Sequence, residues 1–410
     1  MIKAADIIRD AEKSLHALFD EIDVNEEICT RRILDVYRKH EISYRHFAPT
    51  TGYGYDDVGR DALEAVYADV FGTEACIVRP QIASGTHALS LALFGLTRPG
   101  DRILSITGMP YDTLHGIIGI GNNNTPGNLK EYGVSFDSIP LLEDGTINVQ
   151  AVRNAMTENT HLVIAQRSRG YDCRPSLMPE AFDSVSAMLH SEFPETVLMV
   201  DNCYGEFVRP DEPTQHGADV IVGSMIKNPG GGIAPTGGYI AGKKHAVDRI
   251  SWRLTAPGLG RELGSYEASY RTFFQGFFMA PHTVAQALKT ALLASAVFER
   301  IGLKANPSSK DRRADIIQAI SFEKPERLIA FCQAIQAVSP IDSMAVPEPW
   351  DMPGYEDPVI MAAGTFVAGA SIELSADGPM RPPYNAYMQG GLTYTHGRIA
   401  MTEALIRMGY

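Results

Sequence analysis

Cysteine is scarce in this chain, and its placement excludes two kinds of structural support. The 410 residues contain five dispersed cysteines and no Cys-x-x-Cys pair; they are Cys29, Cys76, Cys173, Cys203 and Cys332. An odd, scattered set predicts neither a disulfide framework nor a zinc site, and suits a reducing cytoplasm. His87, His115 and His396 lie near motifs described below, but no histidine shows metal-ligand spacing. We therefore expect no metal site.

Long apolar runs and excess positive charge are also missing. No segment approaches the roughly 18 apolar residues of a membrane-spanning helix, and the charged N-terminus has no signal-peptide core. The net charge of −13 argues against a nucleic-acid partner or an anionic membrane surface. Because 45% of the residues are hydrophobic, the chain can bury a core in more than one domain. We expect a cytoplasmic protein.

What the chain does contain is an alternation of helical patterns with short apolar runs, between residues 61 and 242. This alternation is typical of a parallel sheet flanked by helices, in which ligands bind at the carboxyl ends of the strands. The apolar runs are 102–106, 162–165, 197–200 and 219–223.

The chain divides into four predicted parts. Residues 1–60 form N-terminal helices and a loop rich in Gly, Tyr and Asp, and residues 61–262 form a large α/β domain. A long connecting helix is expected over 263–304, and a smaller α+β domain over 305–410.

Two of the expected strands are followed by side chains that suit one cofactor. One apolar run ends in Asp201, and the next is followed by Ser224 and Lys227. A lysine just beyond a buried strand is partly removed from water, which is expected to lower its pKa and supply the neutral amine of Schiff-base chemistry. In enzymes that use pyridoxal 5′-phosphate (PLP), a lysine carries the cofactor and an acid keeps the ring nitrogen protonated.

A phosphate cradle is expected at Ser84-Gly85-Thr86, which opens an Ala- and Leu-rich helix. Free N–H groups and the helix dipole make such an end an anion site. Each feature alone has a more ordinary explanation, since Ser-Gly-Thr is usually a helix cap, Asp a turn residue and Lys a solvated charge. The conjunction of all three at strand and helix ends favours the PLP site.

These residues resemble the fold-type I PLP enzymes of cysteine and methionine metabolism, which include cystathionine γ-synthase, cystathionine β-lyase and methionine γ-lyase. Over residues 30–410 the chain is most similar to the branch called aluminium-resistance or methionine γ-lyase-like. The segments that carry the resemblance are 166–177, 200–231, 224–242 and 371–396. The resemblance implies the aspartate aminotransferase-like α/β fold, with a large, mostly parallel sheet domain and a small α+β C-terminal domain.

The resemblance also implies roles for single residues. Lys227 would form the Schiff base, with Asp201 at the pyridine nitrogen and Tyr111 stacked on the ring. Tyr111 would also act as an acid in catalysis, although a tyrosine at this position is also compatible with simple packing. The phosphate would be held by Ser84, Gly85, Thr86 and Ser224.

The segment 53–64 resembles a loop that reaches into a neighbouring subunit's site. The family pattern Tyr-x-Arg reads Tyr53-Gly54-Tyr55 here, so the sequence departs from the pattern at the arginine that contacts phosphate, and Tyr55 is left to donate a hydrogen bond. Tyr55 is expected to bind cofactor and Tyr53 substrate, while a packing role for either tyrosine stays open. The resemblance implies a homo-oligomer, a symmetric dimer at least and a dimer of dimers by analogy.

The carboxylate of an amino-acid substrate calls for a planar, bidentate donor. Arg381, in a proline-stiffened segment, is the first candidate and Arg398 the second. Arg167 and Arg169 are further candidates, and a surface salt bridge is an alternative role for Arg381.

The predicted activity is β- or γ-elimination from an amino acid by a PLP-dependent carbon–sulfur or other carbon–heteroatom lyase. The residues do not separate β- from γ-elimination, nor do they identify the leaving group. An aminotransferase or decarboxylase, and a non-catalytic PLP-binding protein linked to metal tolerance, remain alternatives. A nicotinamide-dependent enzyme is disfavoured because no Gly-x-Gly-x-x-Gly follows the first strand with an acidic residue about twenty positions on.

Overall fold

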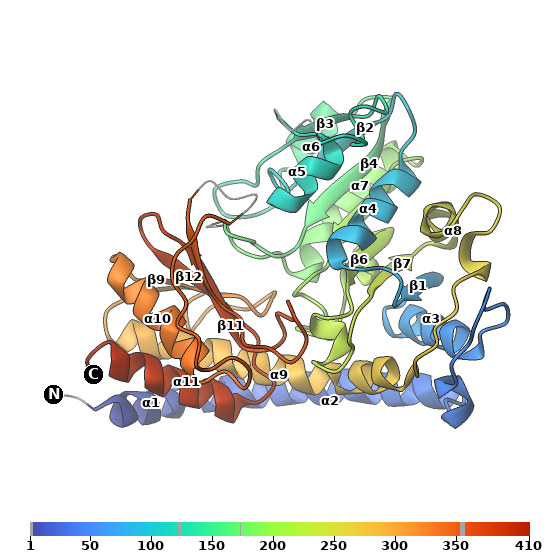
Figure 1. Cartoon of the computed structure of the whole chain (residues 1–410). Coiled ribbons are helices and arrows are strands. Elements are labelled where there is room, and N and C mark those ends of the chain that lie inside the picture. The colour runs from blue at the N-terminus through green and yellow to red at the C-terminus, as the bar shows by residue number, and fades with distance from the viewer. Residues whose placement is uncertain (1–2, 122–124, 173, 353–356) are drawn as a thin grey trace.

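The computed structural model describes residues 3–121, 125–172, 174–352 and 357–410. One of the five cysteines, Cys173, lies outside the described residues. Figure 1 shows a twisted sheet with helices, a second sheet beside it, and long helices running beneath both. Within the described ranges, no helix is long and apolar enough to cross a bilayer.

The larger sheet has seven strands in the order β1-β7-β6-β5-β4-β2-β3. All neighbours are parallel except β7, which runs antiparallel to both β1 and β6. The four apolar runs named from the sequence fall in β2, β4, β5 and β6, which confirms the predicted mostly parallel sheet. The strands are β1 (Ala75–Arg79), β2 (Arg102–Ser105), β3 (Ser135–Ser138), β4 (Thr160–Gln166), β5 (Val197–Asp201), β6 (Val220–Ser224) and β7 (Gly238–Gly242).

Strand β5 shows why these runs are continuously apolar. Its residues alternate between two cores, with Leu198 and Val200 in one and Val197 and Met199 in the other. A strand with both faces covered has no polar face to alternate with. The associated helices are α3 (Val58–Val70), α4 (Gly85–Leu96), α5 (Asp112–Ile118), α6 (Val149–Ala155), α7 (Asp183–Glu192) and α8 (Lys244–Leu254).

The smaller sheet is antiparallel, with the strand order β10-β11-β12-β9-β8. Its strands are β8 (Lys304–Asn306), β9 (Gln318–Ser321), β10 (Val359–Ala362), β11 (Ser375–Pro379) and β12 (Asn385–Gln389). Helices α10 (Pro325–Ala337) and α11 (Tyr394–Arg407) pack beside it. The described part also has five 3₁₀ turns, η1 (Tyr44–Phe47), η2 (Pro179–Phe182), η3 (Pro213–His216), η4 (Asn228–Gly230) and η5 (Gly260–Glu262).

Three helices run along one side of the molecule beneath the two sheets, and of these α9 connects one sheet to the other along the chain (Figure 1). They are α1 (Ala4–Lys13), α2 (His16–Lys39) and α9 (Arg271–Arg300). The helix expected over 263–304 begins only at Arg271. The reason is local: Gly264 adopts φ +122°, and its N–H donates to Tyr53 O in the loop of residues 50–57.

Candidate active site

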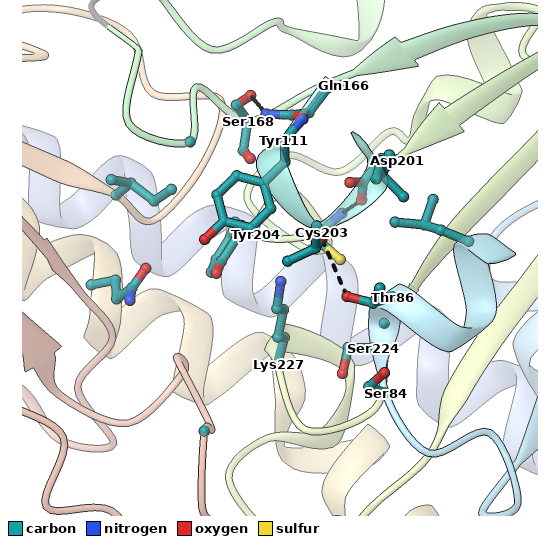
Figure 2. A pocket seen from close by; sticks show the side chains of 18 of the residues that line it. Ser84, Thr86, Tyr111, Gln166, Ser168, Asp201, Cys203, Tyr204, Ser224 and Lys227 are labelled. Atoms are coloured by element: carbon teal, nitrogen blue, oxygen red, sulfur yellow. Dashed lines mark hydrogen bonds between the residues drawn. The ribbon is translucent and has the colours of Figure 1, made fainter. Parts of the chain in front are cut away.

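A cavity of about 260 Å³ lies where the two sheets meet. Its walls come from the carboxyl ends of β4, β5 and β6, the N-terminus of α4, and strands β11 and β12. This is the edge at which ligands bind in parallel α/β sheets. Figure 2 shows Lys227 pointing into the space, with Ser84, Thr86 and Ser224 together on one side and Tyr111, Gln166 and Ser168 above.

Asp201 and Lys227 line the same cavity because their strands are neighbours. Asp201 is the last residue of β5, and β5 pairs in parallel with β6, which ends at Ser224, three residues before Lys227. The N–H of Cys203 donates to Asp201 Oδ1 at 3.1 Å, which fixes the carboxylate's orientation. The fold therefore brings the predicted acid and the predicted lysine to one place.

The pKa of Lys227 differs from the prediction. Burial disfavours the charged amine, but Cys203, Tyr204 and Asp201 favour it more strongly, so the pKa of Lys227 is raised rather than lowered. Its Nζ lies 3.9 Å from the centroid of the Tyr204 ring. A cation over an aromatic face is stabilised by the electrons of the ring. The expectation of a neutral amine was wrong for the protein alone, because desolvation is only one of the influences on this lysine.

The predicted phosphate cradle forms the start of α4. Ser84 is the N-cap, and its Oγ accepts from the N–H of His87 at 3.1 Å. The N–H groups of Gly85 and Thr86 have no acceptor in the part of the chain that the structure describes. These free donors, together with the helix dipole, give the cavity an end that attracts an anion.

Ser224 and Gly85 lie together at the predicted cradle. Ser224 is 1% exposed, and its Oγ has no hydrogen-bond partner among the described residues. A Cβ on Gly85 would stand 3.2 Å from Ser224 Cβ and 3.7 Å from Cys203 Sγ, so a larger residue would crowd the hydroxyl. A buried hydroxyl without a partner is costly, which fits a phosphate oxygen as its missing acceptor. The residues present therefore fit a phosphorylated cofactor such as PLP.

Tyr111 lies opposite the cradle, at the start of α5. Its backbone N–H donates to Gln166 Oε1 at 2.8 Å, and Gln166 Nε2 donates in turn to Ser168 O. The ring of Tyr111 meets the ring of Tyr171 edge to face, with centroids 6.4 Å apart. Both rings line the cavity, and stacking of Tyr111 on a cofactor ring, as the family resemblance implies, stays a prediction.

The smaller sheet contributes a second wall. Asp377 on β11 and Tyr387 and Gln389 on β12 line the cavity, and Tyr387 packs against Tyr171 with centroids 4.9 Å apart. The hydroxyl of Tyr387 donates to Tyr171 O at 2.8 Å. Burial raises the pKa of Asp377 to about 7, and hydrogen bonding from Tyr171 opposes this only in part.

A buried polar network lies beside β5 and β6, outside the cavity. Arg167 Nη1 donates to Asn202 Oδ1 at 2.7 Å and lies 3.1 Å from Glu212 Oε2, and Asn202 Nδ2 donates to the same oxygen. The hydroxyl of Tyr239 donates to Glu206 Oε1 at 2.8 Å. Burial raises the pKa of Glu206 to about 8, so this carboxyl is largely protonated at neutral pH.

The arginine candidates lie elsewhere. Arg381 lines a neighbouring cavity of about 490 Å³ and pairs with Asp357 at 3.1 Å. Arg398 on α11 pairs with Glu12 and lines neither cavity. Arg167 lies in the buried network with Asn202 and Glu212, outside the cavity. Arg169 is 2% exposed, lines the neighbouring cavity and donates to Asn306 O.

Tyr53 and Tyr55 do not line the cavity of their own chain. They are 71% and 58% exposed, and their rings contact each other with centroids 5.6 Å apart. The loop that carries them is held to the segment after η5, since Gly264 N donates to Tyr53 O and Ser265 Oγ to Gly52 O. Two exposed aromatic rings on an anchored loop are typical of a surface that meets a partner.

Several cavity residues were not identified from the sequence. Cys203 and Tyr204 directly follow the predicted strand end at Asp201, so that position was the available signal. The residues from β4 and the smaller sheet lie within segments 166–177 and 371–396, which carry the family resemblance, but no pattern in those segments singled out the side chains that line the cavity. The missed lining residues include Thr113, Gln166, Ser168, Tyr171, Cys203, Tyr204, Asp377, Tyr387 and Gln389.

Comparisons with known proteins give a consistent result. A family model described as methionine gamma-lyase matches residues 4–409. An uncharacterised protein of Bacillus subtilis is 51% identical over 391 residues, which are 95% of this chain and 92% of that protein.

Solved structures agree with the sequence matches. A Listeria monocytogenes protein described as a candidate cystathionine beta-lyase involved in aluminium resistance is 50% identical with a TM-score of 0.96, covering 98% of this chain and 99% of that chain. A Clostridium novyi carbon-sulfur lyase involved in aluminium resistance is 46% identical with a TM-score of 0.95, covering 99% and 96%. A PLP-dependent Escherichia coli protein, 17% identical with a TM-score of 0.62 over 94% and 97%, shares the fold.

Proposed function

The chain belongs to the methionine gamma-lyase family, and from that premise we propose how its cavity serves a PLP-dependent carbon–sulfur lyase that acts on an amino acid. The observation that carries the proposal is that Lys227, Asp201 and the free N–H end of α4 line a single cavity. Lysine, carboxylate and anion cradle are the three contacts that hold PLP by its aldehyde, ring nitrogen and phosphate.

In this proposal the start of α4 would hold the cofactor's phosphate. The N–H groups of Gly85 and Thr86 and the hydroxyls of Ser84, Thr86 and Ser224 donate to its oxygens. Ser224 then gains the acceptor that its buried Oγ lacks. The cofactor's flat ring would be held by packing, because the rings of Tyr111 and Tyr204 and the small side chain of Cys203 line the space for it.

When bound, PLP supplies an electron sink that makes the substrate's α-hydrogen acidic. Asp201 keeps a proton on the ring nitrogen through its carboxylate, which Cys203 N–H orients. With Nζ released as a neutral amine, Lys227 would accept the α-proton and hold it as an ammonium over the Tyr204 ring. Tyr111 supplies the proton that the departing sulfur needs, from the far side of the cavity.

We propose that the active unit is at least a symmetric dimer, assembled as a dimer of dimers. The exposed pair Tyr53 and Tyr55 supports this, because an anchored aromatic loop outside its own cavity is suited to complete a neighbouring one. In that arrangement Tyr55 donates to the partner's cofactor and Tyr53 contacts its substrate. The four described cysteines are free and buried, in keeping with the proposed cytoplasmic location.

Purified protein incubated with L-cystathionine, L-methionine, L-homocysteine and L-cysteine tests the activity. A lyase releases ammonia and a 2-oxo acid from at least one of them without any co-substrate. Cystathionine also separates the two eliminations, since γ-elimination yields cysteine with 2-oxobutanoate and β-elimination yields homocysteine with pyruvate. Glutamate formed only when 2-oxoglutarate is present would instead establish an aminotransferase.

A further inference from the structure

The wall contributed by the smaller sheet carries an acidic group and no basic one. Within the described ranges, the charged residues that line the cavity are Asp201, Lys227 and Asp377, and no arginine lines it. Asp201 and Lys227 are assigned to the cofactor above. Asp377 is therefore the charged group left to meet the substrate.

Asp377 is placed as a binding group. It lies mid-strand on β11, between Met361 of β10 and Tyr387 of β12, so its backbone is fixed by pairing on both sides. The residue is 9% exposed and lines the cavity, and its Oδ1 has no hydrogen-bond partner among the described residues. Tyr171 hydrogen-bonds to this carboxyl, which leaves Oδ1 as the open oxygen. A rigid strand that carries an open carboxyl oxygen into a ligand cavity is pre-organised for a further donor.

The chemistry of the wall narrows what that donor can be. The phenols beside Asp377 are uncharged donors: Tyr171 hydrogen-bonds to Asp377, and Tyr387 donates to Tyr171 O. Burial without a cation raises the pKa of Asp377 to about 7, so the empty wall disfavours the carboxylate, and a bound cation would favour it. A second carboxylate from a substrate would be repelled by the ionised form.

We propose that Asp377 binds an ammonium group at the far end of the substrate's side chain, so that the preferred substrates are thioether amino acids whose sulfur bears an aminoalkyl chain. The inference rests on the proposed lyase function and names the substrate class. It excludes methionine as the preferred substrate, because its terminal methyl group offers no donor to the open Oδ1 of Asp377.

Two matched substrate pairs test this without assuming β- or γ-elimination. S-(2-aminoethyl)-L-cysteine and S-propyl-L-cysteine differ only by an ammonium in place of a methyl group, and so do the two corresponding L-homocysteine thioethers. A charge-assisted hydrogen bond predicts that kcat/KM is roughly 10- to 100-fold higher for the ammonium member. The difference should lie mainly in KM, since the contact is remote from the reacting atoms.

Asp377→Asn keeps the shape and removes the charge, so it should reduce the ratio within each pair to about one. Asp112→Asn is the matched control, because it removes the same charge from a residue that lines the neighbouring cavity and not this one. The control should keep the wild-type ratio, which separates a direct contact from general attraction of cations. Cofactor absorbance of each variant verifies that it folds and loads.

Equal kcat/KM for both members in wild-type protein would overturn the inference, whether or not Asp377→Asn folds. An equal loss for both members in Asp377→Asn would also overturn it, and would assign the residue to the part that all substrates share. Failure of the lyase function gives a different result, in which no pair releases a 2-oxo acid. The ammonium member would then still perturb the cofactor spectrum at lower concentration if Asp377 binds it.

Discussion

The Nζ of Lys227 lies 3.9 Å from the centroid of the Tyr204 ring, and the Tyr204 backbone is in the left-handed region with φ +72°. A non-glycine residue in this region costs roughly 1–3 kcal/mol, and such residues concentrate at functional sites. Tyr204 follows the end of β5 by three residues, so the strained turn aims its ring at the lysine. The two residues together determine where the amine stands in the cavity.

Lys227→Ala should therefore abolish covalent capture of PLP. Wild-type protein incubated with PLP and reduced with borohydride should carry the cofactor on the peptide that contains Lys227, as mass spectrometry can show, and the variant should carry none. Lys243→Ala is the control, since Lys243 pairs with Asp219 at 2.6 Å outside the cavity, and it should be labelled as wild type is. A label that persists in Lys227→Ala would place the cofactor on another lysine.

Ser224→Ala should leave the stability of the cofactor-free protein unchanged or raise it, but should weaken PLP binding. Without cofactor the change removes a buried hydroxyl that has no partner, so the free energy of unfolding should stay the same or rise. With PLP the lost contact to a charged phosphate should weaken binding by at least about 10-fold. Urea unfolding of the apo protein and a spectroscopic titration with PLP measure the two effects.

Ser105→Ala is the matched control for this experiment. Ser105 is equally buried, but its Oγ donates to Gly108 O at 2.6 Å, and it does not line the cavity. Its loss should destabilise the apo protein by about 1 kcal/mol and leave the affinity for PLP unchanged. If Ser224→Ala behaves in the same way as Ser105→Ala, the Ser224 hydroxyl has no part in holding phosphate.

Glu206→Gln should make stability less dependent on pH. Burial raises the pKa of Glu206 to about 8, with Glu212 adding to the increase and Tyr239 and Lys227 opposing it. Between the unfolded value of about 4.3 and pH 8 the folded chain holds a proton that the unfolded chain has lost. The free energy of unfolding contributed by this group therefore falls as pH rises, by up to about 1.4 kcal/mol per pH unit.

Urea unfolding at pH 5.5, 7 and 8.5 checks this prediction. The stability of Glu206→Gln relative to wild type should increase across the series, and the increase should level off above pH 8. Glu403→Gln, at a partly exposed i,i+4 pair with Arg407, should give a nearly constant difference. A constant difference for Glu206→Gln would mean that this carboxyl is ionised in the folded protein.

The sequence predicted those parts of the site that depend on a single strand and the residues at its end. The continuous apolar runs identified β5 and β6 because both faces of each strand are buried, and Asp201 and Lys227 followed from the ends of those strands. The charge state of Lys227 was not predictable in the same way. It depends on Tyr204, whose ring reaches the lysine only through a left-handed backbone that no residue pattern announces.

The second wall was missed for a different reason. Asp377 and Tyr387 belong to an antiparallel sheet more than a hundred residues after Lys227, and they become neighbours of the lysine only when the two sheets pack together. Arg381 is close in sequence to that wall, yet it lies beyond the end of β11 and faces the neighbouring cavity. Sequence distance from a motif is thus a poor guide to which side chains enter a cavity between domains.

Mixed dimers test whether Tyr55 acts in the neighbouring subunit. Tyr55→Phe alone should reduce activity, because the lost hydroxyl weakens the hold on cofactor by roughly 10-fold, and Lys227→Ala alone should be inactive. Subunits with different affinity tags allow the heterodimer of the two variants to be purified. If Tyr55 acts across the interface, one of its two sites combines an intact Lys227 with an intact Tyr55, and activity should return to about half that of wild type.

The same heterodimer gives the opposite result if Tyr55 serves its own chain. Each site then contains one of the two substitutions, and activity should stay at or below that of Tyr55→Phe. A heterodimer of Lys227→Ala with Tyr44→Phe is the control, since Tyr44 is 90% exposed and lies outside the loop of residues 50–57. Its single intact lysine sets the value expected for one working site, so recovery in the Tyr55 heterodimer can be compared directly with it.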